Sequence, residues 1–203
     1  MQAQYEFTAD WFSDTIDNWK AILSRRGPID RVLEIGSYEG RSTVWIIENL
    51  LTGRPTSLVA IDEWHGGQEA HQKDMVAIEA RFDRNVQLAS ERHPTVNITK
   101  RKGRSVVELA ALLASDEYRG SFDLIYIDGS HYAHDVLSDL VLSFGLCKVG
   151  GLLFCDDYLW SQTRGLTETP KLAIDSFVNC FHQKVRVVVG SPLYQLYLYK
   201  FAN

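Results

Sequence analysis

Short apolar strands alternate with helical segments along most of this 203-residue chain. Apolar, β-branched runs predict strands over residues 31–35, 57–61, 96–99, 122–127 and 151–155. Amphipathic spacing predicts helices over residues 41–51, 72–88, 106–114, 133–146 and 170–182. Strands that alternate with helices of this length form a parallel sheet with helices on both faces. This order restricts the chain to an α/β fold.

The C-terminal segment predicts a β-hairpin. Residues 185–189 and 193–201 are strand-like, and Gly190-Ser191-Pro192 joins them as a turn. Such a hairpin brings one antiparallel strand to the edge of a parallel sheet. We therefore expect a Rossmann-like α/β fold with a mostly parallel, seven-stranded sheet and helices on both faces.

The chain length fits a single domain that buries one substantial core. Apolar residues between Trp11 and Leu23 recur at helical spacing, which predicts an amphipathic helix over residues 8–26. The expected domain spans residues 1–203 and divides into an N-terminal helical extension (1–27), a cofactor-binding core (30–178) and the terminal hairpin (185–201).

The charge balance bears on the partners of the protein. A net charge of −5 argues against nucleic acid, because proteins that bind a phosphate backbone usually carry a basic excess. The basic run Lys100-Arg101-Lys102-Gly103-Arg104 is expected to be a solvated loop. No apolar run approaches the roughly 18 residues of a membrane span, and the N-terminus lacks a secretory leader pattern. We expect a cytoplasmic protein with a small-molecule partner and no membrane partner.

The loop after the first strand is the first candidate binding motif. The segment Val32-Leu33-Glu34-Ile35-Gly36-Ser37-Tyr38-Glu39-Gly40 runs from a strand through a glycine-bearing turn to a helix. A dinucleotide site would use G-x-G-x-x-G to approach a pyrophosphate, but this chain has G-x-x-x-G preceded by the acid Glu34. A carboxylate repels pyrophosphate and suits an ammonium group, which favours S-adenosylmethionine as the cofactor. The alternative is an ordinary turn that uses glycine for its backbone freedom.

The end of the second strand carries Asp62 and, two residues later, Trp64. An acid at this position can bind both ribose hydroxyls of a nucleoside, although an Asp after a strand is as often a turn cap. Trp64 could cover an adenine ring, and an aromatic residue packed within the loop is an equal alternative.

The turn after the third strand contains Gly103, followed by Ser105 at the start of a helix. Ser105 and Glu108 match the S-x-x-E capping box, so we expect Ser105 to be the N-cap residue. The same turn borders the adenine site in folds of this type, and Ser105 could serve both purposes.

Three carboxylates follow the fourth and fifth strands, namely Asp128, Asp156 and Asp157. Neighbouring parallel strands lie about 4.8 Å apart, so acids at both strand ends can converge. Oxygen ligands alone point to a hard cation, Mg²⁺ above all. The alternative is that one or more of these acids caps the loop that follows.

His131 lies in the loop just past Asp128 and would overhang that metal site. A histidine titrates near neutral pH and can remove a proton from a substrate hydroxyl. Asp128 could take this role if the histidine points away, and a surface position without a catalytic role remains the alternative for His131.

At these residues the chain resembles the class I S-adenosylmethionine-dependent methyltransferases. VLEIGSYEGRST is similar to the first motif of the catechol O-methyltransferase group, and IDGSHYAHDVLSDL with GGLLFCDDY is similar to the bacterial macrocin-type sugar O-methyltransferases. The resemblance covers residues 30–178.

The resemblance implies a set of site residues. The methionine end of the cofactor would be surrounded by Glu34, Gly36, Tyr38, Gly40 and Ser42. It further implies Asp62 on the ribose, Ser105 beside the adenine, and Asp128, Asp156 and Asp157 on the metal. His131 stands where the catechol group has its catalytic lysine, and Asp157 stands where that group has Asn.

The resulting hypothesis is methyl transfer from S-adenosylmethionine to a hydroxyl of a sugar, phenol or polyketide-like molecule, assisted by a divalent metal. Three alternatives stay open: a metal-independent N- or O-methyltransferase, a non-catalytic cofactor-binding module, and an NAD-linked oxidoreductase. The aromatic N-terminal helix and the hairpin could also form a homodimer or a higher oligomer.

Overall fold

The computed structural model describes residues 4–66, 74–161, 163–190 and 192–203 of the chain. Its strands are β1 (Arg31–Ile35), β2 (Thr56–Asp62), β3 (Val96–Lys102), β4 (Phe122–Ile127), β5 (Cys147–Cys155), β6 (Val185–Val187) and β7 (Leu196–Lys200). Its α-helices are α1 (Ile16–Leu23), α2 (Arg41–Asn49), α3 (Met75–Arg92), α4 (Ser105–Ala114), α5 (Ala133–Leu146) and α6 (Pro170–Cys180). Two short 3₁₀ turns, η1 (Ser13–Thr15) and η2 (Leu166–Glu168), precede α1 and α6.

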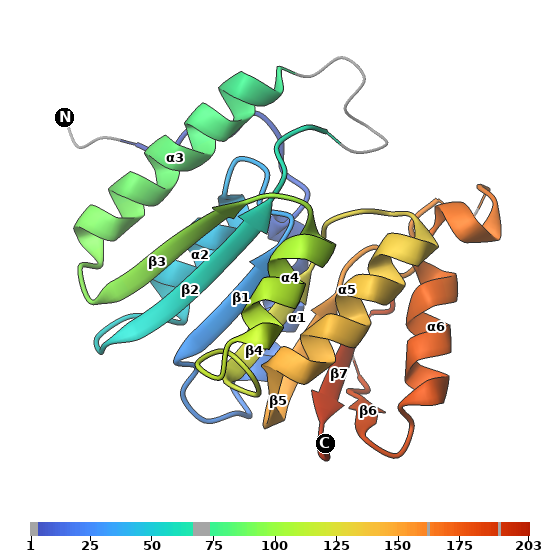
Figure 1. Cartoon of the computed structure of the whole chain (residues 1–203). Helices are drawn as coiled ribbons and strands as arrows, with labels where there is room; N and C mark the ends of the chain where they lie inside the picture. Colours follow the sequence, from blue (N-terminus) through green and yellow to red (C-terminus); the bar gives the residue numbers. More distant parts are fainter. Residues whose placement is uncertain (1–3, 67–73, 162, 191) are drawn as a thin grey trace.

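The seven strands form one sheet in the order β3-β2-β1-β4-β5-β7-β6, as Figure 1 shows. Strands β1 to β5 pair in parallel, and β7 pairs antiparallel with both β5 and β6. The expected Rossmann-like sheet with a C-terminal hairpin strand is confirmed. The strand order reverses between β1 and β4, and ligands of such sheets bind beyond the carboxyl ends of the strands at this point.

Helices cover both faces of the sheet (Figure 1). Alternate residues of β4 show how the two layers divide. Leu124 and Tyr126 belong to the core shared with α1, α2 and α3, whereas Ile125 and Ile127 belong to the core shared with α4, α5 and α6. Every residue of β4 is buried, as expected for a central parallel strand.

The predicted N-terminal helix over 8–26 is wrong in its first half, because only Ile16–Leu23 is α-helical. The backbone before it is irregular and is held by tertiary hydrogen bonds. Thr8 donates its backbone N–H and its hydroxyl to Glu39, and Arg41 donates to the carbonyl of Ala9. Asp10 then accepts from the backbone N–H of Ser13 at 3.0 Å and caps the 3₁₀ turn. Glu39 and Arg41 are remote in sequence from Thr8 and Ala9, so helical spacing could not reveal these contacts.

Most other predicted boundaries agree with the structure to within a few residues. Strand β3 continues to Lys102 because it pairs with β2 over that additional length. Strand β5 begins at Cys147, which pairs with Phe122 ahead of a register shift between the two strands. The predicted helix start at Gln72 lies outside the described residues, and α3 begins after Asp74, which caps Ala77. No helix within the described residues combines the length and apolar character of a membrane span.

Candidate functional site

The glycine turn after β1 lies against the loop after β4. Gly36 has a φ of +84°, and a β-carbon built on it would lie 1.9 Å from the carbonyl oxygen of Asp128. The close approach that requires glycine at this position is therefore made by the protein's own backbone, whereas we expected a ligand there. The turn after β1 and the loop after β4 are therefore in direct backbone contact at the carboxyl edge of the sheet.

Gly40 forms the second end of the turn and is the N-cap residue of α2. Its φ of +81° lies in the left-handed region, and a β-carbon there would lie 3.0 Å from the Phe82 ring. Tyr38, between the two glycines, also has a positive φ, of 49°. Its ring lies 4.9 Å from that of Trp11, which is 57% exposed. The turn is thus tightly specified by backbone conformation and by packing from α3.

Glu34 is completely buried beneath this turn. Its carboxylate accepts hydrogen bonds from the hydroxyls of Ser37 (2.8 Å), Ser42 (2.6 Å) and Thr43. Burial raises the pKa of Glu34, and the three hydroxyl donors oppose that shift. The described contacts of Glu34 and Ser42 therefore join β1 to the start of α2. Their predicted contact with the cofactor remains a prediction.

Asp62, at the end of β2, binds the same turn. One carboxylate oxygen accepts the backbone N–H groups of Ser37 and Tyr38, each at 2.9 Å, and the other accepts that of Trp64 at 2.7 Å. This is the capping role that we considered as an alternative. The predicted contact with ribose stays open, since Asp62 is only partly buried.

Trp64 is 3% exposed, which fits a packed loop aromatic better than a surface for adenine. Its indole N–H donates to the carbonyl of Tyr38 at 2.9 Å, and its ring lies 4.8 Å from that of Phe82. The ammonium of Lys100 lies 4.5 Å from the centre of the same ring.

The predicted capping box at Ser105 is wrong. Ser105 is the first residue of α4, Arg104 occupies the N-cap position, and no side chain caps the helix. Glu108 instead forms an ion pair with Arg101 at 2.7 Å, because the partner on β3 offers a full charge. A β-carbon on Gly103 would lie 2.6 Å from a Glu108 oxygen, so a larger residue in this turn would displace the Glu108 side chain.

The three predicted acids meet at the carboxyl ends of β4 and β5. The hydroxyl of Tyr126 contacts Asp128 at 2.9 Å and also contacts Asp156. The phenol of Tyr126 thus links the two carboxylates through its single hydroxyl group. Burial and the neighbouring acids raise the pKa of Asp128 and of Asp156 above the usual range.

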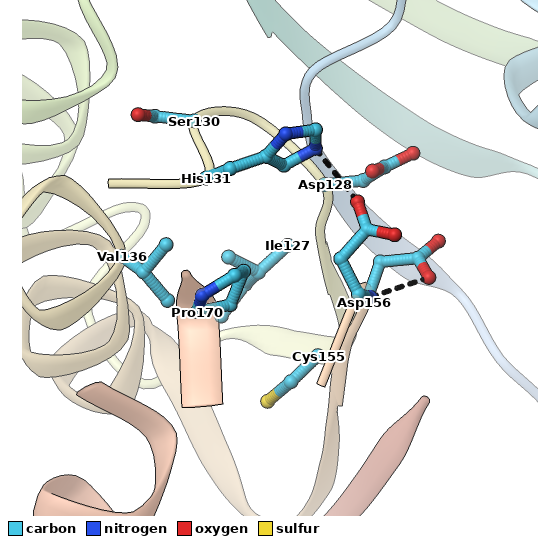
Figure 2. Close-up of a pocket in the computed structure, with 9 residues that line it drawn as sticks. Ile127, Asp128, Ser130, His131, Val136, Cys155, Asp156 and Pro170 are labelled. Carbon is cyan, nitrogen blue, oxygen red and sulfur yellow. Dashed lines mark hydrogen bonds and ion pairs between the residues drawn. The ribbon is translucent and has the colours of Figure 1, made fainter. Parts of the chain in front are cut away.

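The His131 ring contacts the carboxylate of Asp157, as the dashed line from the ring in Figure 2 shows. Its Nε2 lies 2.8 Å from a carboxylate oxygen of Asp157, and its ring lies 4.1 Å from the Trp160 ring. Asp157 itself has a φ of +56°, a strained conformation of the kind found at functional sites. With Nε2 bound to Asp157, the lone pair that can accept a proton is on Nδ1.

A small pocket opens beside these groups (Figure 2). The residues that line it are Ile127, Asp128, Ser130, His131, Val136, Cys155, Asp156, Asp157 and Pro170. The structure therefore brings together the predicted base and all three predicted metal ligands, while Glu34, Asp62 and the glycines lie at the neighbouring strand ends.

Residues that were not predicted from the sequence complete the site. Gln195, 2% exposed, donates to Asp156 at 2.8 Å and accepts from Trp19 at 2.9 Å. The hydroxyl of Tyr194 donates to Asp157 at 2.8 Å. Only Tyr126 had a sequence signal, since it lies on a buried strand two residues before Asp128. The partners from the loop before β7 had none.

The donor chemistry of the acids fits a hard divalent cation, because it consists of carboxylate oxygens that repel one another. The positions of these side chains fit a metal ion less well than their chemistry does. Among residues 4–66, 74–161, 163–190 and 192–203, no three His, Cys, Asp or Glu side chains are placed to hold one metal ion. In this arrangement Asp157 is bound by His131 and Tyr194.

A protein-family model described as a methyltransferase domain matches residues 33–158, well over half of the chain. This span contains the glycine turn, Asp62, His131 and the three acids. No curated protein matches the chain at the level required for significance.

Solved structures share the fold. An O-methyltransferase from Bacillus cereus in complex with S-adenosylhomocysteine has 15% identity and a TM-score of 0.62, with 98% of this chain and 84% of that one covered. TomG of Streptomyces achromogenes, an O-methyltransferase of tomaymycin synthesis bound to S-adenosylmethionine, has 15% identity and a TM-score of 0.64 over 94% and 81%. The MycE methyltransferase of mycinamycin biosynthesis, in complex with Mg and S-adenosylhomocysteine, has 18% identity and a TM-score of 0.58 over 97% and 51%.

Proposed function

This chain belongs to the methyltransferase-domain family, and we propose that it transfers a methyl group from S-adenosylmethionine to a hydroxyl group of a small molecule. The observation that carries the proposal is the contact between the Gly36 turn and the Asp128 loop. It sets a turn suited to the methionine end of the cofactor beside a histidine and three carboxylates. Such a layout places a methyl donor next to groups that can bind and deprotonate an acceptor.

The reaction is an in-line displacement at the methyl carbon. The acceptor oxygen forms the new C–O bond while the C–S bond breaks, and the sulfonium becomes the neutral thioether of S-adenosylhomocysteine. The proton of the hydroxyl passes to Nδ1 of His131, whose Nε2 is held by Asp157. The Trp160 ring fixes the orientation of the imidazole. The protein contributes mainly alignment in a site from which water is excluded.

We further propose that a divalent cation, Mg²⁺ above all, assists the reaction. Asp128, Asp156 and Asp157 would hold it. A bound cation would lower the pKa of the acceptor hydroxyl and balance the negative charge of the acids. A vicinal diol or a catechol could chelate such a cation, so sugars, phenols and polyketide-like molecules are the acceptors that we expect. Support comes from the raised pKa values of Asp128 and Asp156.

A metal-independent methyltransferase is the second candidate, and the contact between His131 and Asp157 favours it. A histidine oriented by a carboxylate can deprotonate an oxygen or nitrogen acceptor without a cation. The third candidate is a module that binds the cofactor without catalysis.

Two measurements separate the candidates. Isothermal titration with S-adenosylmethionine tests the family function, and no binding at millimolar ligand would refute the whole proposal. The acceptor class and the need for a metal are tested by measuring release of S-adenosylhomocysteine with diol, phenol and amine acceptors, with and without EDTA. Loss of turnover in EDTA with recovery on Mg²⁺ supports the metal, whereas full turnover in EDTA favours the second candidate. Binding without turnover on any acceptor favours the third.

A further inference from the structure

A cavity lies at the amino ends of β4 and β5, at the edge of the sheet opposite the three acids. It has a volume of about 270 Å³ and is lined by residues of β4, of β5 and of the segment between α1 and β1. Asp123, which lines it, lies five residues before Asp128 along β4, a distance of roughly 16 Å in an extended strand. The cavity is therefore separate from the site of the proposed methyl transfer.

A break in the pairing of β4 with β5 lies beside this cavity. The two strands are in register from Leu124 onward, but the register shifts at Asp123, opposite residues 148–151 of β5. Gly150 lies in this irregular stretch with a φ of +93°, which is unfavourable for other residues. Bulges of this kind are common at sheet edges and beside functional sites, where they redirect side chains.

The charged residues that line the cavity comprise one acid and three cations. The acid, Asp123, is buried and already bound by the protein. One of its oxygens accepts the backbone N–H groups of Asp30 (2.9 Å) and Arg31 (2.8 Å), and the other contacts the ammonium of Lys148. The neighbouring acid Asp30 pairs with Arg54 at 2.6 Å. Each carboxylate thus has its own cation.

The other two cations of the cavity are Arg25 and Arg26. Within the described part of the chain, neither guanidinium donates to a carboxylate or a carbonyl. The guanidinium of Arg26 lies 4.3 Å from the centre of the Tyr199 ring, which restrains the side chain. Both residues follow the last turn of α1, where the helix dipole stabilises cations. Two neighbouring guanidinium groups are therefore held at the cavity with donors that the protein does not use.

We propose that this cavity binds a small oxyanion with two negative charges, a phosphate group or a dicarboxylate, through Arg25 and Arg26. A guanidinium donates two parallel hydrogen bonds to a phosphate or a carboxylate. The lining has a positive excess in a chain whose net charge is −5. Its volume lies just below the range of pockets for drug-sized ligands, which fits a small anion better than a nucleotide. Binding there does not depend on the proposed methyl transfer.

Isothermal titration with inorganic phosphate and with malonate, at pH 8 and at an ionic strength held constant with NaCl, tests this site. We expect saturable binding of one anion per chain with a dissociation constant of about 1 mM or lower. Arg25→Ala/Arg26→Ala should weaken it at least about tenfold, because each guanidinium supplies charge-assisted hydrogen bonds. Tighter binding of phosphate identifies a phosphate ligand, and tighter binding of malonate identifies a dicarboxylate.

Arg84→Ala/Arg119→Ala is the control matched for charge. The side chains of Arg84 and Arg119 are 58% and 55% exposed, and neither residue lines the cavity. This variant should bind the anion as wild type does. Arg25→Ala alone removes an exposed side chain and tests the site if the double variant fails to fold.

Three results would overturn the proposal. The first is no saturable binding by wild type up to about 10 mM of either anion. The second is equal weakening in the control variant, which would reduce the effect to net charge. The third is displacement of the anion by S-adenosylhomocysteine, which would place it in the cofactor site. A protein that binds phosphate but no S-adenosylhomocysteine would retain this site while the proposed function fails.

Discussion

Gly36 and Asp128 are in backbone contact across the carboxyl ends of β1 and β4, where a β-carbon on Gly36 would lie 1.9 Å from the Asp128 carbonyl oxygen. The contact lies at the point where the strand order reverses. It joins the proposed cofactor turn to the acids at the proposed reaction centre. A distortion of the Gly36 turn must therefore displace the Asp128 loop, and a distortion of the loop must displace the turn.

Gly36→Ala should be severely destabilising. Its methyl group would overlap the Asp128 carbonyl, and its φ of +84° is unfavourable for alanine, so we expect the free energy of unfolding to fall by about 3 kcal/mol or more. Urea unfolding measures this loss. Gly53→Ala is the control, because Gly53 has a similar φ of +80° and no atom near its missing β-carbon. It should cost only about 1 kcal/mol, and equal losses would refute the steric argument.

Glu34→Gln should destabilise the turn by about 2 kcal/mol, because an amide nitrogen cannot accept from the surrounding hydroxyls. Ser42→Ala removes one of the three donors and should cost about 1 kcal/mol. Both losses of stability can be measured by chemical denaturation. A Glu34→Gln variant as stable as wild type would show that the carboxylate does not organise the turn.

Asp139 should make stability depend on pH. Burial and the nearby Asp135 raise the pKa of Asp139 to about 7, from a usual value near 4 in the unfolded chain. Below pH 4 both states hold the proton. As the pH rises toward 7 only the unfolded state releases it, so the free energy of unfolding falls by an amount on the order of 4 kcal/mol.

Asp139→Asn removes this titration. Its unfolding free energy should match that of wild type near pH 4 and exceed it increasingly up to pH 8. Thermal or urea unfolding at several pH values gives the difference between the two proteins, in which contributions from other acids cancel. A difference independent of pH would contradict the assignment.

His131→Ala should separate catalysis from cofactor binding. Loss of the base should lower kcat by about 10²- to 10⁴-fold. The dissociation constant of S-adenosylhomocysteine should stay within about twofold, because no proposed cofactor contact involves the imidazole. His134→Ala is the control, since the His134 side chain is 77% exposed. Comparable losses of turnover in both variants would remove His131 from the mechanism.

Much of the fold follows from local pattern. The continuous apolar run of β4 and the lengths of the intervening helices predict a buried parallel strand in an α/β sheet, and the structure has both. The N-terminal segment shows the limit of this reasoning. Apolar spacing around Trp11 and Phe12 is helical, but Glu39 and Arg41 bind the backbone of Thr8 and Ala9, and this segment is irregular.

The candidate site was predictable to the extent that it depends on strand ends. Asp128, Asp156 and Asp157 follow adjacent parallel strands, and the structure places them together beside His131. Their hydrogen-bond partners were not predictable. Gln195 reaches Asp156 from the loop just before β7, the strand that pairs antiparallel with β5, and nothing in its local sequence marks it.

The sequence by itself determined which residues stand at the carboxyl ends of the strands, because hydrophobic periodicity and glycine turns are local properties of the chain. Only the tertiary structure decided what those residues touch. Gly36 makes room for the Asp128 backbone where we expected a ligand, Glu34 is enclosed by three hydroxyls, and Asp139 is buried close to Gly129. Contacts of this kind depend on strand order and on helices brought together from distant parts of the chain, and no local pattern encodes them.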